Sequence, residues 1–92
     1  MSYYEKLYFK IKNNPKDVMF DELRTLMTKV GGFNDRPGKG DHWIFTHPDF
    51  PDIRIVIDTR GGRKPLKPIY VKKCMKYFDE VNPHFKEVKN NE

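Results

Sequence analysis

The chain has 92 residues, of which 37% are hydrophobic and 34% are charged, and its formal net charge is +5. This length suits one domain with a small core, and an aromatic content of 14% argues against intrinsic disorder. No apolar run approaches the ~20 residues that cross a bilayer, lysines interrupt any secretory signal, and the single cysteine cannot form an internal disulfide. We therefore expect a cytoplasmic protein that does not associate with membranes.

The first third of the chain predicts two helices. Apolar side chains at helical spacing indicate a helix over residues 3–13, which Pro15 prevents from continuing. A second helix is expected over residues 20–29, with acidic residues in its first turn. Gly31-Gly32 then supplies the left-handed residue that ends it.

The middle of the chain predicts three short strands. They cover residues 33–36, 41–46 and 53–58, and the two connections between them are turns over 37–40 and 47–51. A glycine-rich loop over residues 60–63 follows the third strand. Short connections between consecutive strands indicate an antiparallel meander.

A last helix is predicted from Pro68 to the residues before Pro83. Its apolar stripe comprises Val71, Cys74, Met75 and Phe78. The predicted organisation is an amino-terminal helical extension over residues 1–17, a domain over 18–83 and a charged tail over 84–92. The fold class is α+β, with a three-stranded antiparallel sheet and helices packed on one face, so the other face stays open.

Basic residues concentrate in the segment between the third strand and the last helix. Residues 60–76 contain seven basic residues and no acidic one: Arg60, Arg63, Lys64, Lys67, Lys72, Lys73 and Lys76. Such a stripe favours a polyanionic partner, although a solvated helix face with a polar loop produces the same pattern.

His42 is the candidate for acid–base chemistry. Alternation along the second strand points Trp43 and Phe45 toward the helices and His42 toward the open face. Histidine transfers protons near neutral pH, and the basic residues Arg36 and Lys39 precede it. An exposed strand residue without a chemical role fits the same pattern.

The order of motifs from residue 18 to residue 81 resembles the HicA toxin family, small ribonucleases of type II toxin–antitoxin modules. The motifs are Gly32-Phe33, Arg36, Gly40-Asp41-His42, the stretch Ile44 to Pro48, the strand Ile53 to Ile57, and Leu66-Lys67-Pro68. The resemblance implies a fold like that of a double-stranded-RNA-binding domain, cleavage of mRNA, a HicB-type antitoxin as partner, and His42 as the catalytic residue.

Two features depart from the family pattern. Asp41 replaces the usual serine, and we expect its side chain to accept hydrogen bonds from turn amides after Gly40. The helix over residues 3–13 precedes the usual start of the family, so the resemblance gives it no role.

The remaining candidates follow from the chemistry of RNA cleavage, which needs an acid, a base and cations near the phosphate. Arg36 and Lys39, with Lys64 and Lys67, are the predicted phosphate-binding residues. His47 is expected to be structural, His84 is a weak candidate, and Cys74 is expected in the core. We expect no metal and no cofactor.

Two other functions remain open. One is a non-catalytic RNA-binding domain that reads A-form shape through the basic stripe. The other is a protein-interaction domain that docks an acidic partner.

Overall fold

A computed structural model describes residues 2–85. Its regular elements are the helices α1 (Tyr3–Asn13), α2 (Phe20–Thr25) and α3 (Pro68–Val81), and the strands β1 (Asn34–Pro37), β2 (His42–His47) and β3 (Phe50–Asp58). A π-helical turn, Leu26–Val30, continues α2, and a 3₁₀ turn, Arg60–Gly62, follows β3. Within residues 2–85, every helix is too short or too polar to cross a bilayer.

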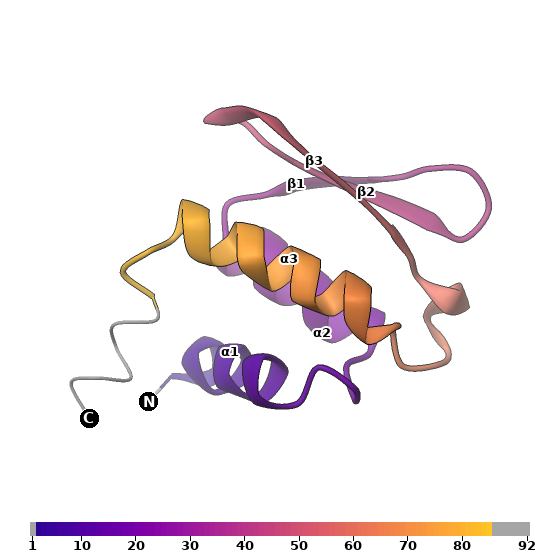
Figure 1. Ribbon diagram of the computed structural model, residues 1–92, viewed down its shortest axis with the longest axis horizontal. Coiled ribbons are helices and arrows are strands. Elements are labelled where there is room, and N and C mark those ends of the chain that lie inside the picture. The colour runs from indigo at the N-terminus through magenta and orange to yellow at the C-terminus, as the bar shows by residue number, and fades with distance from the viewer. Residues whose placement is uncertain (1, 86–92) are drawn as a thin grey trace.

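The three strands form one antiparallel sheet in the order β1-β2-β3. The sheet lies on one side of α2 and α3, and α1 lies on the side of these helices that faces away from the sheet (Figure 1). The α+β class and the three-stranded antiparallel sheet are therefore confirmed. Among the described residues, no helix covers the outer face of the sheet (Figure 1).

The core forms between the inner face of the sheet and the helices. Its fully buried members come from all three helices and from β2 and β3; the largest are Tyr8, Phe45, Phe78, Ile11, Leu23, Leu26, Met27, Ile55 and Ile57. The predicted stripe of α3 is buried along its whole length. Buried residues alternate with more exposed ones from Ile53 to Asp58, so β3 contributes one face only to the core.

The amino-terminal helix α1 is part of this core. Leu7, Tyr8 and Ile11 are buried, and the Tyr8 hydroxyl donates a 2.6 Å hydrogen bond to Oδ1 of Asp79 in α3. Ser2 caps the helix by accepting a hydrogen bond from the Glu5 amide. The helix that the family resemblance does not explain therefore packs on the domain.

The connection between β2 and β3 is shorter than the predicted turn over residues 47–51. Strand β3 begins at Phe50, so the turn contains Pro48 and Asp49 only. A β-bulge between Thr46 and His47 allows this, because it shifts the register where the strands leave the turn. Prolines made this segment look like a loop, although proline is tolerated at the start of a strand.

The second helix also differs from its prediction. The α-helix ends at Thr25, and the next five residues form the π turn. Gly31 follows with a negative φ, and Gly32 is the left-handed residue. A Cβ on Gly31 would lie 2.8 Å from the carbonyl oxygen of Met27 and 2.9 Å from Phe78, so close packing requires glycine there.

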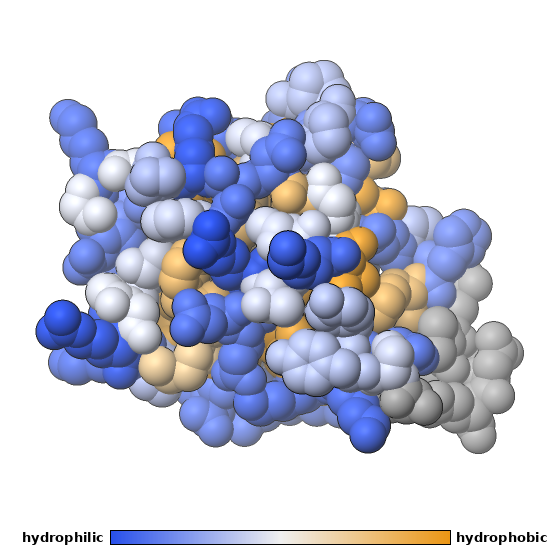
Figure 2. Space-filling model, turned by 180° about the vertical axis from the view of Figure 1, so that it is seen from behind, coloured by the Kyte–Doolittle hydropathy of each residue, from blue (hydrophilic) through white to orange (hydrophobic). Residues whose placement is uncertain are grey.

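The surface reflects the charged composition. Seen from the side opposite to Figure 1, hydrophilic side chains cover most of the molecule, and hydrophobic ones show only between them (Figure 2). The predicted charged tail lies outside the described residues, except for His84 and Phe85.

Candidate functional site

His42 is the first residue of β2, and its side chain is exposed on the outer face of the sheet. Phe45, on the opposite parity, is fully buried, and Trp43 packs against the core. The predicted orientation of the strand is therefore confirmed. The outer face is not bare around His42, since Ile44 is only 8% exposed and its side chain lies beside Gly38.

Strand pairing brings charged residues to both sides of His42. Asp58 of β3 is its direct cross-strand partner, and directly opposed residues have Cβ atoms roughly 4.5–5.5 Å apart. Arg36 of β1 pairs with Ile44, so it is the diagonal neighbour of His42 on the same face. The outer face therefore presents an imidazole between a carboxylate and a guanidinium.

The turn between β1 and β2 fixes the backbone of His42. The His42 amide donates to the carbonyl oxygen of Lys39 at 3.0 Å, and the His42 carbonyl accepts from the Gly38 amide at 2.9 Å. Gly40 has a φ of 57°, which a side chain would make unfavourable. Because these bonds tie Lys39 to the start of β2, its ammonium group is carried at the same end of the sheet as His42.

The connection that follows β3 meets this turn at the same end of the sheet (Figure 1). The Thr59 amide donates to the carbonyl oxygen of Asp41 at 2.8 Å. Arg60, Gly61 and Gly62 all have left-handed φ values. The Asp58 carboxylate supports this turn by accepting a 2.9 Å hydrogen bond from the Arg60 amide.

Between these two turns lies an open hollow of about 400 Å³. Its lining comes from the start of α2, the β1–β2 turn and the turn after β3: Phe20, Asp21, Gly40, Asp41, His42, Trp43, Thr59, Gly61 and Gly62.

The prediction for the Asp41 side chain is wrong. Within the described residues it makes no hydrogen bond, and the His42 amide, which follows Gly40, donates to the carbonyl oxygen of Lys39 instead. Only the backbone carbonyl of Asp41 is used, by Thr59. Asp41 is exposed and lines the hollow, and its carboxylate stays without a hydrogen bond among the described residues.

The other two predicted phosphate-binding residues lie farther along the chain. Lys64 and Lys67 are exposed in the connection that leads from the turn after β3 to α3, and neither lines the hollow beside His42. The Leu66 amide anchors this connection by donating to the carbonyl oxygen of Val18 at 2.8 Å. The structure thus groups Arg36 and Lys39 with His42 and leaves Lys64 and Lys67 at the periphery.

His47 is structural, as predicted. It is 8% exposed, its Nε2 lies 3.2 Å from the carbonyl oxygen of Gly31, and its Nδ1 accepts from the Asp49 amide at 3.1 Å. The acceptor role of Nδ1 places the proton of the neutral ring on Nε2. Its ring also meets Phe33 and Phe50 edge to face.

Cys74 is a core residue. It is fully buried, and burial raises the pKa of its thiol to about 12, so it has no thiolate character near neutral pH. Within residues 2–85, no three histidine, cysteine or acidic side chains gather where they could hold a metal ion.

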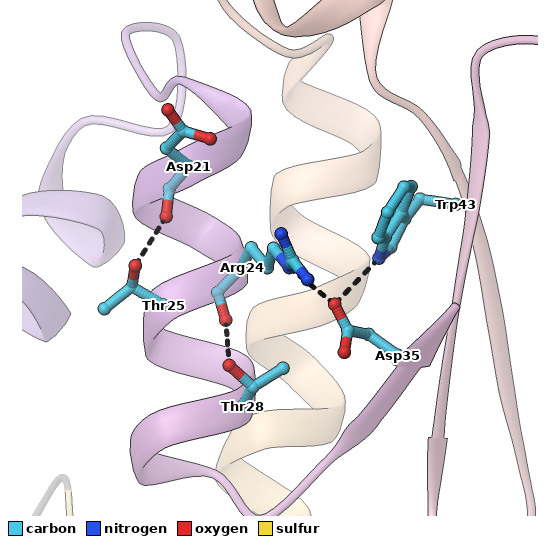
Figure 3. A network of polar contacts seen from close by, with 6 residues as sticks. All are labelled: Asp21, Arg24, Thr25, Thr28, Asp35 and Trp43. Carbon is cyan, nitrogen blue, oxygen red and sulfur yellow. Dashed lines mark hydrogen bonds and ion pairs between the residues drawn. The ribbon is translucent and has the colours of Figure 1, made fainter. Parts of the chain in front are cut away.

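Trp43 is fixed by a network behind the site (Figure 3). Its Nε1 donates to Oδ2 of Asp35 at 3.0 Å, and Nε of Arg24 reaches the same oxygen at 2.6 Å. The Arg24 guanidinium lies 5.0 Å from the ring centroid of Trp43, and Phe20 meets the ring edge to face. Trp43 therefore joins α2, β1 and β2 immediately next to His42.

Two outer-face residues were missed from the sequence, Asp58 and Arg54. Arg54 pairs with Thr46, so arginines lie on both sides of β2 along this face. The alternation of β3 places both side chains on the outer face. Which residues of β2 lie opposite them depends on the strand register, and the bulge between Thr46 and His47 sets that register.

Comparison of the chain with known protein families, with curated proteins and with solved structures finds no match.

Proposed function

We propose that this protein is an endoribonuclease that cleaves mRNA, the toxin of a type II toxin–antitoxin module of the HicA kind. The observation that supports it best is the exposed imidazole of His42 on an uncovered sheet face, with Arg36 across the neighbouring strand and Lys39 in the adjoining turn. Among residues 2–85 no helix covers this face, so an extended polyanion can lie along it without an enclosed pocket.

The mechanism uses the nucleophile that RNA itself carries. The 2′-hydroxyl attacks the adjacent phosphorus and the bond to the 5′-oxygen breaks, so one proton is removed and another is supplied. His42 is the general acid or base, and Arg36 and Lys39 neutralise the negative charge that builds on the phosphoryl oxygens. The reaction as proposed uses no metal ion or cofactor.

The fold and the partner belong to the same proposal. The order α2-β1-β2-β3-α3 supports likeness to a double-stranded-RNA-binding domain. The uncovered outer face is the surface that a HicB-type antitoxin would cover in the cytoplasm.

The test is cleavage of mRNA by the purified chain, with EDTA present. His42→Gln should reduce the rate at least 100-fold, because general acid–base catalysis contributes about 10²–10⁴-fold. RNA affinity should remain within about twofold of the wild-type value, since phosphate contacts dominate affinity. His84→Gln is the matched control and should cleave normally; undiminished cleavage by the His42 variant would refute the assignment.

The alternative is a non-catalytic RNA-binding domain. The lysines on the exposed side of α3, Lys72, Lys73 and Lys76, favour it. RNA binding without cleavage by the wild-type chain would support this alternative.

A further inference from the structure

We propose that the hollow beside His42 binds a guanine base of the RNA, and that Asp41 recognises its amino edge. The inference rests on the proposed function, because it assigns the base next to the phosphate that His42 acts on. The hollow shares His42 as a lining residue, so a nucleotide whose phosphate lies on the sheet has its base within reach.

The walls of the hollow suit a flat heteroaromatic ring. Phe20 and Trp43 form an aromatic wall, with ring centroids 5.1 Å apart. Gly40, Gly61 and Gly62 lie on other sides, and a Cβ on any of them would meet nothing within 4 Å. Unstacked RNA bases bind to proteins by contact with aromatic side chains and by hydrogen bonds to their edges.

Two unused polar groups line the hollow. The Asp41 carboxylate makes no hydrogen bond within the described residues. Thr59 is only 6% exposed, yet its hydroxyl has no hydrogen-bond partner there. Every fully buried side-chain polar atom of the described residues has a hydrogen-bond partner. The unpartnered Thr59 hydroxyl is therefore not fully buried, and the hollow is the space that Thr59 lines.

These groups favour guanine among the four bases. A carboxylate only accepts hydrogen bonds, and its two oxygens match two adjacent donors. Guanine presents such a pair, N1–H and the 2-amino group, whereas none of the other three bases carries two adjacent donors along this edge. The Thr59 hydroxyl, which donates as well as accepts, suits a base carbonyl oxygen.

The charges around the hollow are arranged for a nucleotide. The carboxylates of Asp21 and Asp41 would repel a phosphate inside the hollow. The position of Asp21 is explained by the first turn of α2, where a negative charge stabilises the helix, whereas Asp41 has no such role. Lys39 and Arg60 belong to the two turns that form the rim, and both are exposed. The phosphate therefore finds its cations on the rim, and the base edge finds its acceptor inside.

The experiment uses the single tryptophan of the chain as a local probe. Guanosine and inosine monophosphates, which differ by the 2-amino group alone, are titrated while Trp43 fluorescence is recorded. The guanosine nucleotide should bind about tenfold more tightly, as expected for a hydrogen bond to a charged group. Asp41→Asn should remove most of this preference, whereas Asp49→Asn, the same change at the other hairpin turn, should preserve it.

The two proposals fail in different ways. The guanine site would be overturned by equal affinities for the two nucleotides or by an unaltered preference in Asp41→Asn. It would also be overturned if Trp43 fluorescence responded to arginine methyl ester and to neither nucleotide, a result that would favour a cationic protein side chain as the ligand. A guanosine preference without any cleavage of RNA would overturn the proposed ribonuclease and leave the base site intact.

Discussion

The two histidines of β2 have the same side chain and opposite surroundings. His42 is exposed at the start of the strand, and His47 is buried at its end between the carbonyl of Gly31 and the amide of Asp49. Alternation puts them on opposite faces because five positions separate them along the strand. A histidine with both ring nitrogens engaged in the core holds the fold together, and one whose ring faces solvent is free to exchange protons with a substrate.

This contrast predicts opposite effects on stability. His47→Ala should lower the free energy of unfolding by roughly 2–3 kcal/mol, since it opens a cavity and leaves buried polar groups without partners. His42→Ala should change it by less than about 0.5 kcal/mol, as expected for an exposed strand residue. Urea denaturation followed by circular dichroism measures both, and equal losses would contradict the assigned roles.

At the scale of the element, α1 is held to α3 through one tyrosine. The Tyr8 ring packs on Phe78, and its hydroxyl donates to Asp79, which also pairs with Lys12. Burial and the Asp79 carboxylate both disfavour the phenolate, so the pKa of Tyr8 is raised well above its ordinary value. The contact therefore links the docking of α1 to pH.

Tyr8→Phe should lower the free energy of unfolding at neutral pH by about 1–2 kcal/mol, the value of a hydrogen bond to a charged group. The stabilisation from the neutral hydroxyl is complete below the unfolded-state pKa of about 10 and declines as pH rises above it, because only the unfolded chain then readily loses the proton. Urea titrations at pH 7 and pH 11 should show the difference between wild type and variant shrinking. A difference that grows with pH would contradict this reading of the contact.

The elements also show what the sequence could and could not predict. Periodicity located α1 and α3, and alternation oriented β2, because each depends on neighbouring residues only. The pairing of His42 with Asp58 depends on the bulge, where Pro51, Asp52 and Ile53 lie between the partners of Thr46 and His47. The bulge inserts an odd number of residues. Without it, the side chains of β3 that now face the core would lie on the outer face, and those on the outer face would point into the core.

The hollow could not be predicted from the sequence, because it also depends on strand pairing. Its lining combines the start of α2 with two turns that lie about 20 and 40 residues away along the chain, and strand pairing brings them together. The prediction for Asp41 rests on local turn chemistry. In the structure, the amides of Gly38 and His42 donate to backbone carbonyl oxygens and not to the Asp41 side chain. Local rules therefore predicted the outer-face histidine correctly and the adjacent aspartate wrongly.

At the scale of the whole molecule, the fold divides the basic stripe of residues 60–76 into two parts. Arg60, Arg63, Lys64 and Lys67 lie in the connection between β3 and α3, which begins at the hollow beside His42. Lys72, Lys73 and Lys76 lie on α3, and Lys72 and Lys76 line a separate groove against α1. The two candidate functions place RNA differently: a nuclease centred on His42 uses Arg36 and Lys39 on the sheet, and an RNA-binding domain that uses its last helix needs the lysines of α3.

Salt dependence of RNA binding separates these functions. Each neutralised phosphate on single-stranded RNA contributes about 0.7 to the slope of log affinity against log salt. If RNA follows the outer face of the sheet, the double variant Arg36→Gln/Lys39→Gln should lower the magnitude of that slope by about 1.4. The matched variant Lys72→Gln/Lys76→Gln carries the same net charge and should leave it unchanged. The reverse result would place the RNA on α3, away from His42, and would contradict the proposed nuclease site.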